Sequence, residues 1–150
     1  MLENIKKMVM ASYPAQENKG VFLSLFDVQG KLILSNGVVK SAKSLEITIE
    51  TLYHGLVEKN VDSLHQLYVD VVTLVREEND MQKLFQIPLK DYGLVLSTVD
   101  GTKSAVMLPN TGGIADVKHA LSLMKQKHSI DGNVLIFVFQ TERFIIDKTS

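Results

Sequence analysis

The chain has 150 residues, of which 45% are hydrophobic and 22% are charged, and it contains no cysteine. A chain of this size and composition can bury a continuous core, so it is expected to form one globular domain over residues 1–150. The lack of cysteine excludes disulfides, thiolate nucleophiles, iron–sulfur clusters and cysteine-based zinc sites. The 16 basic and 17 acidic residues nearly cancel, so there is no general signal for nucleic-acid binding, although a local basic strip is compatible with this balance.

The beginning of the chain, MLENIKKMVMASYPAQ, alternates charged and apolar side chains, which is not the pattern of a secretory signal. No later apolar run is long enough to span a bilayer. Together with the lack of cysteine, these patterns predict a soluble, cytoplasmic protein without a membrane partner.

The first elements are expected to be a helix and a hairpin. Apolar residues at helical spacing predict a short amphipathic helix within residues 1–12 that ends before Pro14. The polar residues 16–20 indicate a loop. In the next stretch, VFLSLFDVQGKLILSNG, two apolar runs flank Gly30, which can supply the positive φ of a short turn.

A second helix and a long strand are expected to follow. The stretch SLEITIETLYHGLVEKN predicts a helix with Ser44 as its N-cap. Its apolar residues share one helical stripe, formed by Leu45, Ile49, Leu52, Tyr53 and Leu56. LHQLYVDVVTLV is rich in valine, leucine and tyrosine, so it predicts a long strand that is buried on at least one face. The charged residues 76–80 then indicate a turn.

The clearest local signal is DYGLVLSTVDGTKSAVML, where two apolar runs flank Asp100-Gly101, a dipeptide typical of tight hairpin turns. Further on, a helix that ends near Ser129 is predicted from the spacing of Val117, Ala120, Leu121 and Met124. Cationic residues in its last turn suit the helix dipole. The final stretch, VLIFVFQTERFII, has a run of six apolar residues and predicts a central strand with both faces covered.

The order of these elements predicts an α+β fold, because hairpins require antiparallel pairing. The expected antiparallel sheet is built from two hairpins, a long strand and a C-terminal strand, and it packs with about three helices. No internal repeat, low-complexity segment or linker divides the chain.

Histidine is a common metal ligand and general base, but the four histidines have no known ligand spacing. His119 and His128 are nine positions apart on one predicted helix, which places them on opposite faces. Asp116 and His119 supply only two ligands, which is too few for a metal site. No metal site is therefore predicted, and the sequence names no cofactor.

Catalytic motifs are also missing. No serine lies in G-x-S-x-G or S-x-x-K, so no catalytic residue is predicted and enzymatic activity is not favoured, although a triad is defined by space and not by sequence. The acidic residues Glu77, Glu78 and Asp80 are expected to form a solvated corner, because they lie in a polar turn without nearby apolar residues.

The turn in VMLPNTGGIADVKHAL is a candidate site for an anion. Its residues are Pro109, Asn110, Thr111, Gly112 and Gly113, and backbone N–H groups at a helix N-terminus bind phosphate and carboxylate well. The turn contains neither G-x-G-x-x-G nor G-K-[ST], and it follows a hairpin strand. Two interpretations therefore stay open: the glycines bind an anion, or Pro109 ends the strand and the glycines only permit the bend.

One stretch, KDYGLVLSTVDGTKSAVMLPNTGGIADVKHALSLMKQKHSI (90–130), resembles the AMMECR family in its element order and its Leu-Pro turn at 108–109. GVFLSLFDVQGKLILSNG is similar to the first hairpin of that family, so the resemblance covers about residues 20–144. It implies an α+β fold with an antiparallel sheet. Family members have no securely established activity, and prokaryotic members are often associated with a dioxygenase-like partner and a radical-SAM protein.

The hallmark of the AMMECR family is an Arg-Gly-Cys-Ile-Gly stretch. The matching residues in this chain are Ile33, Leu34, Ser35, Asn36 and Gly37. Only Gly37 is retained, and the arginine and the cysteine are missing. The resemblance therefore carries over only Gly37 and the Leu108-Pro109 turn.

Three functions follow as hypotheses. The favoured one is a noncatalytic binding protein of the AMMECR type, in which Ser35, Asn36 and Gly37 meet the turn at 109–113 and form a cleft for a small anionic ligand or a partner protein. The second is a dimerising interaction module of the roadblock or longin type, with an exposed apolar helix or strand edge. The third is an enzyme whose site is assembled from scattered residues. The oligomeric state stays open, with a dimer expected for the second hypothesis.

Overall fold

The computed structural model describes residues 1–148 and has the expected α+β fold. Its six strands form one sheet with the order β2-β1-β3-β6-β4-β5. The pairs β1–β2, β1–β3, β4–β5 and β4–β6 are antiparallel. The central position predicted for the C-terminal strand is confirmed, because β6 lies between β3 and β4.

The chain divides into two compact units, each with its own apolar core. The first unit is Met1–Thr73 together with the segment from Glu142 onward, and the second is Leu74–Thr141. The two longest strands, β3 (Gln66–Glu77) and β6 (Val134–Asp147), contribute to both units. The single folding domain expected from the chain length stays a prediction, since two compact units can still unfold together.

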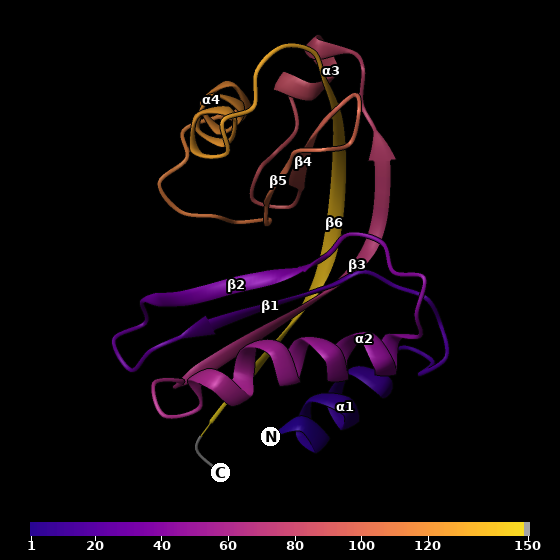
Figure 1. Ribbon diagram of the computed structural model, residues 1–150, viewed down its shortest axis with the longest axis vertical. Coiled ribbons are helices and arrows are strands. Elements are labelled where there is room, and N and C mark those ends of the chain that lie inside the picture. Colours follow the sequence, from indigo (N-terminus) through magenta and orange to yellow (C-terminus); the bar gives the residue numbers. More distant parts are fainter. Residues whose placement is uncertain (149–150) are drawn as a thin grey trace. The chain divides into compact units, whose positions relative to one another are not determined.

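The first unit contains the predicted N-terminal helix, hairpin and second helix (Figure 1). Gly30 has the positive φ of 78° that the hairpin turn requires. The Ser44 side chain accepts a hydrogen bond from the Ile47 N–H at 3.3 Å, which confirms it as an N-cap. The elements are α1 (Leu2–Met10), β1 (Val21–Phe26), β2 (Leu32–Val38) and α2 (Leu45–Leu52), followed by a π-helical turn (Tyr53–Val57) and a 3₁₀ turn (Glu58–Asn60).

The core of the first unit forms where α1 and α2 cover one face of β1 (Figure 1). Alternate residues of β1 point to that face, as the two-residue period of a strand requires. Full burial of aliphatic side chains of this size stabilises a fold by about 1.5–3 kcal/mol each. The fully buried residues of these three elements are Ile5, Val9, Val21, Leu23, Leu25, Leu45 and Ile49.

The second unit contains the predicted second hairpin and C-terminal helix. Gly101 has a φ of 75° in the hairpin turn, and Asp116 caps the helix by accepting a hydrogen bond from the His119 N–H at 2.8 Å. Its elements besides the long strands are α3 (Met81–Phe85), β4 (Gly93–Thr98), β5 (Ser104–Met107) and α4 (Val117–Lys127). Within residues 1–148, every helix is too short or too polar to cross a membrane.

The charged turn expected at residues 76–80 was wrong for its first two residues. Arg76 and Glu77 do not belong to a turn, because they are the last two residues of β3. A fourth helix, α3, follows, which agrees with the expected number of about three but was not predicted at this place. It has only five residues, and Leu84 is the one that is buried, so it leaves no periodic apolar pattern in the sequence.

A buried ion pair joins β3 to β6 in the first unit. Asp70 is 0% exposed, and the Arg143 guanidinium donates to both of its carboxylate oxygens, from Nε at 2.9 Å and from an Nη atom at 3.3 Å. The guanidinium carbon also lies 4.8 Å from the centroid of the Tyr68 ring. The two-pronged contact gives the pair a defined geometry, so it specifies how the two strands face each other.

We predict that Arg143→Met lowers the free energy of unfolding by about 3–5 kcal/mol, because it leaves the Asp70 carboxylate buried without its cation. Glu58→Gln is the control, since Glu58 pairs with His54 and both side chains are more than half exposed, and it should cost less than about 1 kcal/mol. Urea unfolding followed by circular dichroism measures both values. Equal losses in the two variants would contradict the structural importance of the Asp70 pair.

Candidate functional site

The second unit contains an open cleft with a volume of about 410 Å³. This volume falls in the range of small-ligand sites. The walls are the end of β3, the helix α3 and the segment that leads into β4. The lining residues are Arg76, Glu78, Lys83, Gln86, Ile87, Pro88 and Tyr92.

Local sequence explains why α3 forms beside this cleft. The Asp80 carboxylate accepts hydrogen bonds from the backbone N–H groups of Gln82 at 2.9 Å and Lys83 at 3.4 Å, which satisfies two free donors of the first turn. Leu84 is fully buried and anchors the helix in the core of the unit. Pro88 cannot continue a helix, so α3 ends before it.

The end of β3 supplies the opposite charges of the cleft. Arg76 Nη1 donates to Glu78 Oε1 at 3.1 Å, and the Glu78 N–H donates to the Ile136 carbonyl of β6 at 2.9 Å. The Glu78 side chain is only 11% exposed, so the expectation that it belongs to a solvated corner was wrong. The pairing with Arg76 offsets the cost of burying this carboxylate.

The remaining polar groups of the cleft are donors without a charged partner. No ion pair joins Lys83 to another residue of the described chain. The Gln86 amide and the Tyr92 hydroxyl can both donate hydrogen bonds. The cleft therefore has two cations and one carboxylate, and that carboxylate is already paired.

The predicted site residues Ser35, Asn36 and Gly37 lie in β2 of the first unit. Ser35 shares a hydrogen bond of 2.9 Å with Ser24, and the Asn36 side chain accepts from the Gly37 N–H at 2.8 Å. A Cβ atom at Gly37 would lie 2.2 Å from the Val21 carbonyl oxygen of β1. Gly37 is therefore required by the close approach of two strands.

The predicted site residues Pro109, Asn110, Thr111, Gly112 and Gly113 follow β5 in the second unit. Asn110 donates its N–H to the Leu89 carbonyl at 2.8 Å, and the Thr111 hydroxyl donates to the Leu108 carbonyl at 2.7 Å. Asn110 and Gly113 have positive φ values of 58° and 79°. These contacts and angles account for the bend of the backbone.

The glycines do not adjoin the start of α4, which begins at Val117. The Asp116 carboxylate accepts from the His119 N–H and so occupies part of the helix terminus that an anion would use. The predicted anion site at this turn stays a prediction, as does its meeting with Ser35–Gly37, since the two segments belong to different units.

The histidines that the sequence presents as candidate ligands have structural contacts. His119 accepts the Ala115 N–H on Nδ1 at 3.0 Å, which ties down the residue before the N-cap of α4. His54 Nδ1 lies 2.7 Å from Glu58 Oε1 on an exposed surface. In residues 1–148 there is no cluster of three or more histidine, aspartate or glutamate residues that could hold a metal ion.

Two side chains outside the cleft have strongly shifted pKa values. Burial, and then a hydrogen bond to Glu142, raise the pKa of Tyr13 to about 12. The backbone N–H of Thr102, followed by the Thr98 and Thr102 hydroxyls, lowers the pKa of Asp100 to about 2. Each shift moves the group away from neutral pH, so neither group is tuned for acid–base catalysis there.

Sequence reasoning missed the cleft because Arg76 and Glu78 come from the region interpreted as a charged turn, and no element was predicted for residues 81–89. One signal was available: Asp80 is a good N-cap, the next five residues tolerate a helix, and Pro88 stops it. The pairing of Arg76 with Glu78 depends on the end of β3, which no local pattern reveals.

We predict effects of different size for two Gly→Ala substitutions at predicted site residues. Gly37→Ala should lower the free energy of unfolding by about 1–3 kcal/mol, because the new methyl group overlaps the β1 backbone. Gly112→Ala should change it by less than about 0.5 kcal/mol, because no atom lies within 4 Å of the added Cβ. Thermal unfolding compares the two variants, and a silent Gly37→Ala variant would contradict the close strand approach.

No family model matches the sequence, and no curated protein matches it. Among solved structures, the chain is similar to the uncharacterized protein PH0010 from Pyrococcus horikoshii, with a TM-score of 0.71 and 19% sequence identity. The similarity covers 87% of this chain and 75% of that chain. At this identity the comparison shows that the two proteins share a fold.

Proposed function

We propose that this chain is a noncatalytic binding protein whose cleft in the second unit binds a small anionic ligand. The observation that carries the proposal is the meeting of Arg76 and Lys83 in one cleft whose single carboxylate, Glu78, is already paired. The excess positive charge favours a carboxylate or a phosphate over a neutral or cationic ligand.

The chemistry of the lining supports this ligand class. Arginine presents five N–H donors, so the bond from Arg76 to Glu78 leaves others for a ligand. Lys83 adds a point charge from α3, and Tyr92 adds a hydroxyl. Ile87 and Pro88 give the ligand body an apolar wall, which matches the usual mixture of apolar surface and a few polar groups.

This proposal keeps the ligand class that the sequence suggested and moves it to other residues. The AMMECR resemblance is compatible with it, because the family has no securely established activity that would name a different ligand. A cytoplasmic location is part of the same proposal, since small carboxylates and phosphates are abundant metabolites there.

The experiment is a calorimetric titration of the protein with phosphate, pyrophosphate, citrate and a nucleoside monophosphate. We predict that at least one anion binds and that Lys83→Met weakens it about 10-fold or more, as expected for the loss of a charge-assisted hydrogen bond of about 1.5–3 kcal/mol. A ligand at 100 times its dissociation constant should also stabilise the fold by about 2.7 kcal/mol.

Lys90→Met is the matched control, because Lys90 is exposed, follows α3 closely and does not line the cleft. It removes the same charge and should leave the affinity unchanged. Absence of binding by all four anions, or equal losses in the Lys83 and Lys90 variants, would overturn the proposal.

A further inference from the structure

The charged side chains of the helix α4 are all basic. It contains Lys118, Lys125 and Lys127 and has no aspartate or glutamate between Val117 and Lys127. Its apolar side is buried in the core of the second unit, through Val117, Ala120, Leu121 and Met124. At about 100° per residue, Lys118 and Lys125 lie on one flank of this buried side, and Lys127 lies on the opposite flank.

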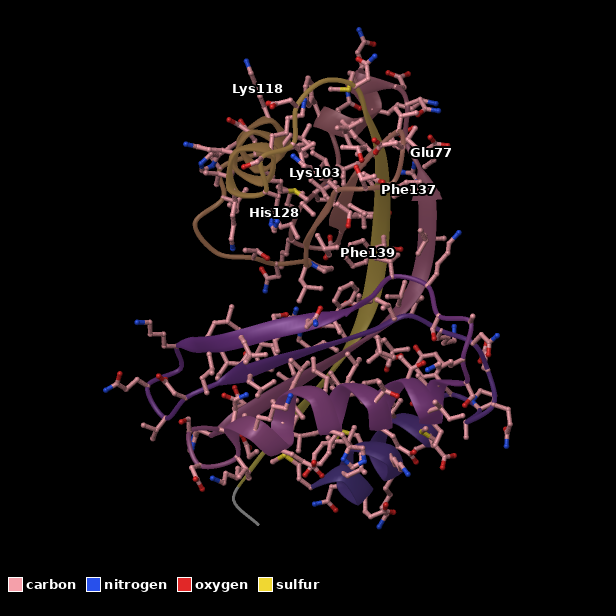
Figure 2. The ribbon with its side chains drawn as sticks, in the orientation of Figure 1. Glu77, Lys103, Lys118, His128, Phe137 and Phe139 are labelled. Carbon is pink, nitrogen blue, oxygen red and sulfur yellow. The ribbon has the colours of Figure 1, made fainter. Side chains whose placement is uncertain are left out.

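Two of these lysines lie on the same side of α4. Lys118, Ser122 and Lys125 are separated by four and then three residues, a spacing that aligns side chains along a helix. The two lysines are about 10 Å apart along the axis, at a rise of 1.5 Å per residue. Lys103 lies beyond the C-terminal end of the helix, where its ammonium donates to the Ser129 carbonyl at 2.9 Å. Figure 2 labels Lys103, Lys118 and His128 around α4. We call Lys103, Lys118 and Lys125 the basic stripe.

The carboxylates near the basic stripe do not neutralise it through ion pairs. In the described chain no salt bridge involves Lys103, Lys118 or Lys125. Asp116 is engaged as the N-cap of α4, and Asp100 accepts hydrogen bonds from Thr98 and Thr102. Asp131 follows the helix in the chain, and no salt bridge joins it to these lysines in the described residues.

We propose that the basic stripe binds the phosphate backbone of double-stranded nucleic acid, independently of the ligand cleft. Cations at intervals along a helix and just beyond its end match a polymer with regularly spaced phosphates. The stripe contains no aromatic residue on which unpaired bases could stack, so a duplex suits it better than a single strand.

Other anionic partners fit the stripe less well. A membrane-surface helix needs an apolar face that enters the lipid, but the apolar face of α4 is buried in the protein core. A protein interface usually has an apolar centre, whereas Ser122 lies between the two lysines on the helix. The whole chain has a net charge of −1, so binding through three lysines should be weak and strongly salt-dependent.

The test is fluorescence anisotropy of a labelled mixed-sequence DNA duplex at several salt concentrations. We expect a dissociation constant of about 10⁻⁶–10⁻⁴ M and a slope of log K against log salt of about −2.7, for three phosphate contacts. Lys118→Ala/Lys125→Ala should reduce the slope to about −0.9, because one contact remains. The control is Lys31→Ala/Lys40→Ala, which removes two exposed lysines of the first unit and should leave the slope unchanged.

Four results would overturn the proposal. The first is no binding of the duplex at low salt. The second is an equal change of slope in the two double variants, since that would show an effect of net charge alone. The third is unchanged binding by the Lys118→Ala/Lys125→Ala variant when its circular dichroism spectrum matches that of the parent. Lipid headgroups also present phosphate, so the protein is titrated with phosphatidylserine vesicles as well. Tighter binding to the vesicles than to the duplex would also contradict the proposal.

Discussion

The buried pair of Asp70 and Arg143 is the constraint on which the arrangement of the long strands depends. A carboxylate on a central strand that is 0% exposed needs a cation beside it. A shift of β6 by one residue would bring Phe144 to the face that Arg143 occupies, and it would turn Arg143 toward the apolar core that Phe144 packs against. The pair therefore disfavours alternative registers of β6. A hydrophobic contact would distinguish between these registers less strictly.

The same strand carries the first residues of the candidate site. After its buried part, β3 becomes exposed and ends with Arg76 and Glu77, and Glu78 is then held by the Ile136 carbonyl of β6. The Asp80 cap starts α3 directly afterwards, so Lys83 follows Arg76 within a few residues of chain. The charged groups of the cleft are thus close together in the chain and are held by the end of a strand and by a capped helix. This limits how far they can move apart.

The parts of the fold that depend on local chemistry could be predicted from the sequence. Gly30 and Asp100-Gly101 mark the two hairpins, Ser44 marks the start of α2, and the apolar run in β6 indicates its central position. The five-residue helix α3 escaped prediction because a single buried leucine makes no periodic pattern.

The site was harder to predict than the fold, because side chains from three elements form it. The turn with Gly112 and Gly113 stood out in the sequence, yet only Gly113 has the positive φ that glycine favours. Arg76 and Lys83 looked like ordinary surface charges, because their convergence depends on where β3 ends and α3 begins. The basic stripe is similar: the spacing of its helix lysines is visible in the sequence, but the contact from Lys103 to Ser129 joins residues far apart in the chain.

The central claim is that the cleft beside α3 is where a small anion binds. The most direct measurement is a set of ¹H–¹⁵N correlation spectra recorded while the binding anion is added. The account predicts progressive shifts of the amide signals of Glu78, Gln86, Ile87 and Tyr92, which line the cleft, and of the Arg76 side chain. Shifts confined to Ser35–Gly37 or to Gly112 and Gly113 would place the ligand elsewhere and would contradict the account.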